Sequence, residues 1–171
     1  MGQIRVGHYF PPEPISVDHQ LDDFDSGELS LNEWLKKRAL KNQATGASRC
    51  FVLCDRQKVV GYYSLSAGAI AREEAPKMWR RNMPNPLPVL LVGRLAIDKS
   101  YHNKGLGSAL LRDAMLRAVH VSGDAGVFAI LVHALSERAK RFYLSRGFVE
   151  FPLQSMTLMM TLETVRSILA E

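Results

Sequence analysis

The stretch Val89–Val119, VLLVGRLAIDKSYHNKGLGSALLRDAMLRAV, joins an apolar run to a glycine-containing turn and then to an amphipathic helical pattern. The apolar run from Pro88 to Ile97 is typical of a strand buried at the centre of a sheet. Gly105 and Gly107 omit side chains where an anion would approach the backbone. The free N–H groups and positive dipole end of a helix starting near Leu106 would point at that anion. The stretch therefore predicts a phosphate-binding turn between a strand and a helix.

Strand and helix patterns alternate on both sides of this stretch. Before it, the spacing predicts a helix of residues 30–43 that begins with a capping box of Ser30 and Glu33. Next we expect two antiparallel strands and then an irregular loop rich in proline and charge, at Arg49–Leu53, Lys58–Ala67 and residues 72–88.

The glycine turn is followed by a helix, a strand, a second helix and a further strand. One face of the first helix carries Gly107, Leu110, Leu111, Ala114, Ala118 and Val121. Gly147 fits the left-handed position just past the second helix. The later elements are expected at Val127–Val132, Ser136–Arg146 and from Phe148 onward. This succession predicts an α/β fold with at least one parallel strand pair.

Length and composition indicate one globular domain spanning residues 1–171, because 47% of the residues are hydrophobic. No apolar run reaches the roughly 20 residues needed to span a bilayer, and the first residues do not resemble a secretion signal. We therefore expect a cytoplasmic protein without a membrane segment. The net charge of +5 favours an anionic partner.

The two cysteines, Cys50 and Cys54, lie in an alternating strand pattern. Four residues of strand separate their Cα atoms by about 13 Å, which exceeds the ~7 Å limit for a disulfide. No CxxC or HxxxH spacing occurs among the cysteines and histidines, so we predict no metal site. The thiols are expected to be buried or half-buried.

Two segments, in this order, resemble the motifs of a known enzyme family. HNKGLGSALL, residues 102–111, resembles motif A of the GCN5-related N-acetyltransferases (GNAT), and SERAKRFYLSRGF, residues 136–148, resembles motif B. The resemblance extends from about Phe51 to Leu162. It implies the GNAT fold, a mixed central sheet with a splayed central strand pair flanked by helices. It also implies that acetyl-coenzyme A is the co-substrate.

The resemblance assigns the coenzyme to backbone groups of the strand and the turn. His102 stands where the family usually has glutamine or arginine, and Ser136 where many members have asparagine. Both residues are compatible with the motifs, because backbone N–H groups hold the phosphate and Ser136 can cap a helix. The implied coenzyme contacts are Leu95, Ala96, Ile97, His102, Asn103, Lys104, Gly105, Leu106, Gly107, Ser108 and Ser136.

Tyr143 occupies the family's tyrosine position on the motif B helix, which implies that it is the general acid for the departing thiolate. A phenol with a pKa near about 10 is protonated at neutral pH and can donate. No glutamate falls on the apolar strand to act as general base, although Glu73 or Glu74 could reach over from the loop. An α-amine titrates near about 8 and lysine near about 10.4, so the missing base favours an α-amine acceptor.

Four segments resemble a narrower branch, the TacT-like tRNA-acetylating toxins of type II toxin–antitoxin modules. They are LNEWLKKRALKNQATGASR (31–49), YYSLSAG (62–68), RRNMPNPLPVLLVGRLAID (80–98) and VHALSERAKRFY (132–143). The resemblance implies acetylation of the α-amino group of aminoacyl-tRNA, which blocks translation. It also implies a ribbon-helix-helix antitoxin and a homodimer. Lys36, Lys37, Lys41, Arg80, Arg81 and Arg94 would contact tRNA phosphates.

Two alternatives remain at this stage. An acetyltransferase acting on a protein N-terminus, a polyamine or another small amine would not need the basic loop. A coenzyme A-binding module without catalysis, or an antitoxin-bound regulator of its own operon, would not need the hydroxyl of Tyr143. The C-terminal segment 161–171 suggests an amphipathic helix, and we expect its Leu162, Val165 and Leu169 to pack on the protein's own core.

Overall fold

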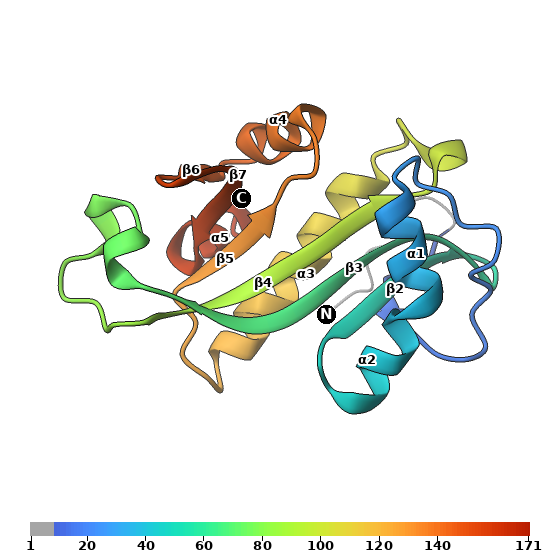
Figure 1. Cartoon of the computed structure of the whole chain (residues 1–171), viewed down its shortest axis with the longest axis horizontal. Coiled ribbons are helices and arrows are strands. Elements are labelled where there is room, and N and C mark those ends of the chain that lie inside the picture. Colours follow the sequence, from blue (N-terminus) through green and yellow to red (C-terminus); the bar gives the residue numbers. More distant parts are fainter. Residues whose placement is uncertain (1–8) are drawn as a thin grey trace. The chain divides into compact units, whose positions relative to one another are not determined.

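The computed structural model describes residues 9–171, which fall into two compact units. The first unit comprises the residues up to Ser66 together with Arg94–Ala114, and the second comprises Ala67–Gly93 and Met115–Glu171. Strands β3 and β4 and helix α3 run from one unit into the other (Figure 1). No helix within residues 9–171 has the length and apolar character needed to cross a bilayer.

The strands form a seven-stranded sheet in the order β1-β2-β3-β4-β5-β7-β6. Strands β4 and β5 pair in parallel, and the β1–β2, β2–β3, β5–β7 and β6–β7 pairs are antiparallel. The α/β class with a mixed sheet and a parallel pair is therefore confirmed. The bounds are β1 Glu13–Pro14, β2 Arg49–Asp55, β3 Lys58–Ile70, β4 Leu87–Ile97, β5 Ala129–His133, β6 Val149–Phe151 and β7 Gln154–Thr161.

The first unit has helices on both faces of its strands. Helices α1 (Leu29–Lys37) and α2 (Ala39–Thr45) contribute to a core cluster that also contains Ala96. On the other face, α3 (Leu106–Ser122) lies close to β3 at Gly61. A Cβ atom at Gly61 would stand 2.7 Å from Cδ1 of Ile97 and 3.1 Å from Cδ1 of Leu110. A larger residue would have to shift the side chains of Ile97 and Leu110, so glycine allows β3, the end of β4 and α3 to approach closely.

The predicted first helix is two helices, and the capping box is wrong. Ser30 lies inside α1, whose N-cap is Glu28, and the helix breaks at Arg38. The start of α1 is held instead by Asn32, whose Oδ1 accepts from the Ser26 N–H at 2.8 Å. Its Nδ2 donates to Asp25 at 2.9 Å. This network begins in the loop before α1. The helical spacing of the sequence does not predict it, because that spacing describes only the helix.

The second unit contains α4 (Glu137–Ser145), α5 (Leu162–Leu169) and the antiparallel β6–β7 pair. Leu162 and Val165 of α5 are buried, which confirms that this helix packs on its own core. Gly147 has a φ of +100°, as expected for the residue after α4. Val121 was expected on the buried face of α3 but is exposed, because it lies in the last turn of that helix.

Candidate active site

The turn between β4 and α3 has the backbone of an anion cradle. Asn103 and Gly105 adopt left-handed φ angles of 62° and 76°, a conformation that aligns successive N–H groups around a concave surface. Ala109 donates to the Gly105 carbonyl at 3.2 Å. The N–H groups of Leu106 and Gly107 lie in the first turn of the helix, so no carbonyl of the helix accepts from them. A Cβ at Gly105 would meet no heavy atom within 4 Å, so the space beside the turn is open. These features fit a phosphate group.

Buried acceptors fix the entrance to this turn. The carboxylate of Asp98, which is 4% exposed, accepts from the N–H groups of Asp25 at 3.0 Å and Ser100 at 2.9 Å. The Asp98 N–H donates to the Val60 carbonyl at 2.8 Å, and the Lys99 N–H to the Asp25 carbonyl at 2.8 Å. The turn is thereby tied to β3 and to the segment before α1. Sequence reasoning missed Asp98, although an aspartate side chain often accepts from the backbone N–H two residues further on.

His102 serves the backbone rather than projecting freely from the turn. Its Nε2–H donates to the carbonyl of Ile97 at 2.8 Å, which braces the end of β4 against the turn. Tyr101 donates its hydroxyl to Asp55 at 2.7 Å, and the Nζ of Lys104 lies 5.3 Å from the centre of the Tyr101 ring. The structure thus groups Ile97, His102 and Gly105 in the first unit, together with a tyrosine and an aspartate that the sequence did not reveal.

Tyr143 lies on α4 in the second unit. The helix is capped by Ser136, whose hydroxyl accepts from the Ala139 N–H at 3.1 Å, as the sequence predicted. The Tyr143 ring is 5% exposed and packs edge-on against Phe142 and Phe148, with ring centres 5.3 and 5.4 Å away. Burial raises the pKa of Tyr143 above its usual value. The phenol is therefore protonated at neutral pH, the state in which it can donate a proton.

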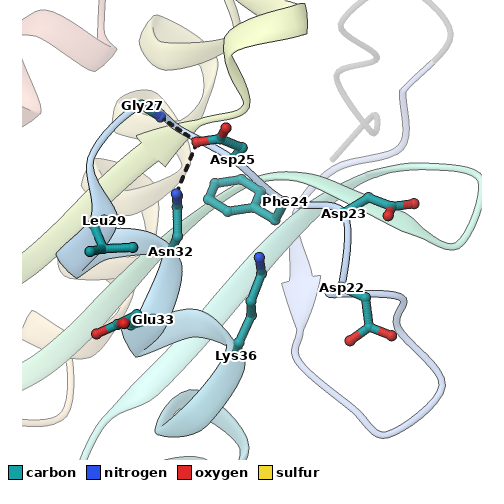
Figure 2. Close-up of a pocket in the computed structure, with 9 residues that line it drawn as sticks. All are labelled: Asp22, Asp23, Phe24, Asp25, Gly27, Leu29, Asn32, Glu33 and Lys36. Carbon is teal, nitrogen blue, oxygen red and sulfur yellow. Dashed lines mark hydrogen bonds between the residues drawn. The ribbon is translucent and has the colours of Figure 1, made fainter.

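The lysines of the first two helices differ in their surroundings. Lys36, Lys37 and Lys41 are exposed, and Lys37 pairs with Glu33 at 3.7 Å. Lys36 lines a cavity of about 440 Å³ (Figure 2). The other charged residues of this cavity are the acids Asp22, Asp23, Asp25 and Glu33. A phosphate group beside Lys36 would therefore lie close to several carboxylates, whose negative charge disfavours it. The spacing of the three lysines did not predict this acidic lining.

The arginine loop lies in the second unit and is partly tied to its own backbone. Arg80 is half-buried and its Nε donates to the Ala75 carbonyl at 2.8 Å, whereas Arg81 is exposed. The proposed base candidates Glu73 and Glu74 lie on the short 3-10 turn Arg72–Glu74 and are both exposed. Arg81 is thus the residue of this pair whose charge faces solvent.

Arg94, the last predicted tRNA contact, lies on β4 in the first unit. Its guanidinium carbon stands 4.3 Å above the centre of the Trp34 ring. The arginine is half-buried, and burial lowers its pKa while Tyr62 and Cys50 raise it. The side chain is therefore fixed against α1 rather than extended from the surface.

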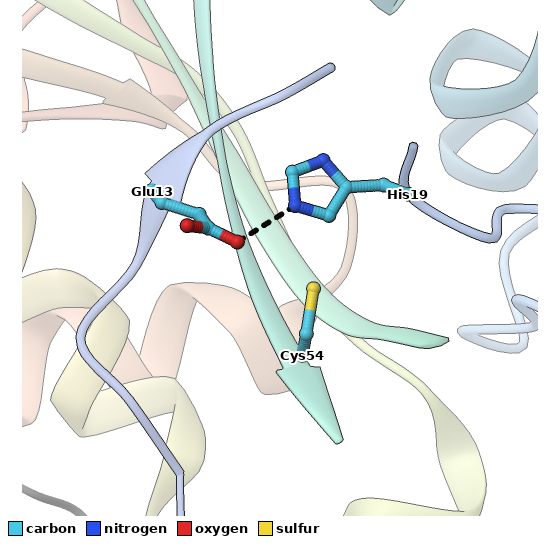
Figure 3. A group of neighbouring side chains, drawn as sticks. All are labelled: Glu13, His19 and Cys54. Carbon is cyan, nitrogen blue, oxygen red and sulfur yellow. Dashed lines mark hydrogen bonds and ion pairs between the residues drawn. The ribbon is translucent and has the colours of Figure 1, made fainter. Parts of the chain in front are cut away.

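Glu13, His19 and Cys54 bring three metal-binding atoms within 4.8 Å of one another (Figure 3). Nδ1 of His19 accepts from the Ser16 N–H at 2.9 Å, so Nε2 carries the ring proton and donates it to Glu13 at 2.8 Å. Burial, together with Glu13, raises the pKa of Cys54 to about 12. In this arrangement His19 Nε2 and the Cys54 thiol each carry a proton, which a metal ion would have to displace in order to bind.

The cysteines form no disulfide. Cys50 is buried and Cys54 half-buried, as the strand geometry predicted. Burial raises the pKa of the Cys50 thiol to about 12, so it is a neutral core side chain.

Comparison with known proteins links these features to one family. The family sequence model of the acetyltransferase (GNAT) domain matches residues 46–150, which include both the anion cradle and Tyr143. A tRNA-acetylating toxin of Mycobacterium tuberculosis (strain ATCC 25618 / H37Rv) is 44% identical over 163 residues, or 95% of this chain and 98% of that protein.

Two solved structures of the toxin AtaT share the fold. AtaT complexed with acetyl-methionyl-tRNAfMet superimposes with a TM-score of 0.86 at 28% identity, covering 92% of this chain and 98% of AtaT. A tyrosine-to-phenylalanine mutant of AtaT, bound to acetyl-CoA and the C-terminus of the antitoxin AtaR, gives a TM-score of 0.81 at 27% identity. That match covers 94% of this chain and 97% of the mutant.

Proposed function

This chain belongs to the GNAT acetyltransferases, and we propose that it is a toxin that transfers acetyl from acetyl-CoA to the α-amino group of an aminoacyl-tRNA. The 44% identity to a tRNA-acetylating toxin over nearly the full length of both chains carries this proposal. Because residues 46–150 of the GNAT match fall in both compact units, we propose that residues 1–171 act as a single domain.

The coenzyme's pyrophosphate would bind at the turn that follows β4. The left-handed Asn103 and Gly105 and the first N–H groups of α3 supply hydrogen-bond donors there, and Lys104 supplies charge. Backbone groups of Leu95, Ala96 and Ile97 would receive the pantetheine. His102 would act by bracing Ile97, since its Nε2–H donates to that carbonyl.

Tyr143 would supply the proton for the leaving group. The neutral α-amine forms a bond to the thioester carbon, the carbon–sulfur bond breaks, and the thiolate takes the phenolic proton of Tyr143. The new amide nitrogen releases a proton to solvent, and the Tyr143 phenolate regains a proton from solvent. The buried, protonated state of the phenol supports this role.

Partners and compartment follow from the same proposal. We expect a ribbon-helix-helix antitoxin to block the site, a homodimer in solution and a cytoplasmic location. The AtaT structure with part of AtaR supports antitoxin control. Helix α5 packs its Leu162 and Val165 within the second unit, so we do not assign the antitoxin to that face.

Incubation with labelled acetyl-CoA, total aminoacyl-tRNA, a protein mixture and polyamines tests the proposed substrate. We expect the label in the RNA fraction, released as an N-acetyl amino acid when mild base cleaves the ester. Tyr143→Phe, which keeps the ring packing, is the matched control and should leave the RNA nearly unlabelled. Label confined to proteins or polyamines would contradict a tRNA substrate while leaving the acetyltransferase assignment intact.

A further inference from the structure

Trp34 stacks with both Arg94 and Tyr62 in the first unit. The guanidinium carbon of Arg94 lies 4.3 Å above the Trp34 ring centre. The Trp34 and Tyr62 rings are stacked with an interplanar angle of 11° and centres 5.8 Å apart. The hydroxyl of Tyr62 donates to the Leu31 carbonyl at 2.7 Å, which ties the stack to α1. The guanidinium thus rests on a rigid aromatic support.

The guanidinium has an unusual set of neighbours for a half-buried charge. Trp34 is 8% exposed, and its ring contacts both the Arg94 guanidinium and the Tyr62 ring. Within residues 9–171, Arg94 has no carboxylate partner and no side-chain hydrogen bond, and the groups that influence its pKa are Tyr62 and Cys50. The Trp34 ring compensates the charge on one side of the guanidinium. The other side has no ion pair within the described residues and can receive a ligand.

Arg94 is also next to the proposed site of acetyl transfer. It precedes Leu95 by one residue, or about 3.3 Å of strand. Arg94 and Ala96 share one face of β4, and Ala96 belongs to the same buried cluster as Trp34. In an aminoacyl-tRNA, a few covalent bonds join the α-amine to the ribose of the last nucleotide, so its base must lie within roughly 10 Å of the acceptor nitrogen.

We propose that Arg94 is the stacking platform for the terminal base of the single-stranded 3′ end of tRNA. One face of the guanidinium lies on Trp34 and the other receives the base. Arginine planes and aromatic rings are the groups on which unpaired RNA bases stack. This inference rests on the proposed function and changes the expected role of Arg94 from a phosphate contact to a base contact.

The test compares two RNA hairpins of equal charge that end in CCA. In one, the terminal nucleotide carries adenine, and in the other it is abasic. Fluorescence anisotropy gives the Kd of each hairpin for the wild-type protein and for Arg94→Lys, which keeps the charge and loses the plane. For the wild type, we expect the Kd of the abasic hairpin to be at least fivefold higher than that of the adenine hairpin. For Arg94→Lys, we expect the two hairpins to have the same Kd.

Arg112→Lys is the matched control, because Arg112 is exposed, lies in the same unit and is assigned to no ligand. It should discriminate the hairpins as well as the wild type does. Equal wild-type affinity for both hairpins would overturn the stacking role, and this result needs no variant to fold. A wild-type preference retained in Arg94→Lys would also overturn it. Failure of the proposed function is distinguished by the labelling experiment, where it appears as wild-type protein that acetylates no RNA.

Discussion

The turn that follows β4 is held by the buried carboxylate of Asp98 and by the donor His102, whereas the loop that precedes β4 is held mainly by its own arginines. After the strand, Asp98 receives two backbone N–H groups and His102 braces the last residue of β4. Before it, Arg80 donates to the Ala75 carbonyl and Arg72 to the Met83 carbonyl. The turn thus keeps its backbone N–H groups for a ligand, and the loop keeps only part of its charge for one.

This difference assigns separate tasks to the two ends of one strand. A small anionic coenzyme of constant shape requires a backbone fixed to within a fraction of an ångström. An RNA surface requires positive charge with little positional precision. Changes after β4 should therefore affect acetyl-CoA, and changes before it should affect tRNA.

The largest expected effect on activity comes from a residue in neither segment, and the effects expected in both segments are smaller. Tyr143→Phe removes one hydroxyl and keeps the packing with Phe142 and Phe148. We expect kcat for acetyl transfer to fall by about 100- to 1000-fold, because the thiolate leaves without its acid. The Kd values for acetyl-CoA and tRNA, measured by calorimetry and anisotropy, should not change. An unaltered kcat would remove Tyr143 from the chemistry.

Asp98→Ala tests how the turn is held. The substitution leaves the N–H groups of Asp25 and Ser100 without an acceptor, and we expect the free energy of unfolding to fall by about 2 kcal/mol. Chemical denaturation followed by circular dichroism measures it. The counterpart before β4 is Asn85→Ala, which removes the 3.1 Å acceptor of the exposed Arg72 N–H. That change should cost less than about 0.5 kcal/mol, and equal losses would abolish the contrast between the segments.

Gly105→Ala tests the cradle itself. An alanine at a φ of +76° is strained by about 1–2 kcal/mol, although its Cβ meets no neighbour. We expect the Kd for acetyl-CoA to rise about tenfold as the turn relaxes toward another backbone shape. Gly46→Ala introduces the same strain at a φ of +79° after α2 and should leave that Kd unchanged. A comparable rise in both variants would trace the effect to stability alone.

The smallest effect is expected before β4. Arg81→Ala should weaken tRNA binding about threefold and reduce the slope of log Kd against log salt by less than one, with no change for acetyl-CoA. Arg80→Ala should do the same and also lower Tm, because it breaks the bond to the Ala75 carbonyl. Anisotropy at several salt concentrations separates the two. A loss of acetyl-CoA binding in either variant would mean that the loop shapes the coenzyme site.

Local patterns were sufficient for the turn and for much of the fold. Apolar runs, Ser136 as a helix cap and Gly147 after α4 all depend on a few consecutive residues, and each prediction was correct. The capping box at Ser30 failed because a loop network took over its task. Asp25 and Asp98 are 73 residues apart in the chain, and Arg94 meets Trp34 only in the folded protein. Contacts between residues so far apart in the chain cannot be predicted from the spacing of neighbouring residues.

Gly61 has a consequence for how this protein can lose its activity. Its missing side chain lets β3, Ile97 and α3 approach one another, so any larger residue must shift the side chains of Ile97 and Leu110. Ile97 is one of the residues proposed to receive the pantetheine, so a side chain at position 61 would disturb the coenzyme site without being part of it. In a population selected for escape from growth arrest, inactivating alleles should therefore recur at codon 61 as well as at the codons of the catalytic groups. Codon 61 would then collect inactivating mutations although glycine has no functional side chain.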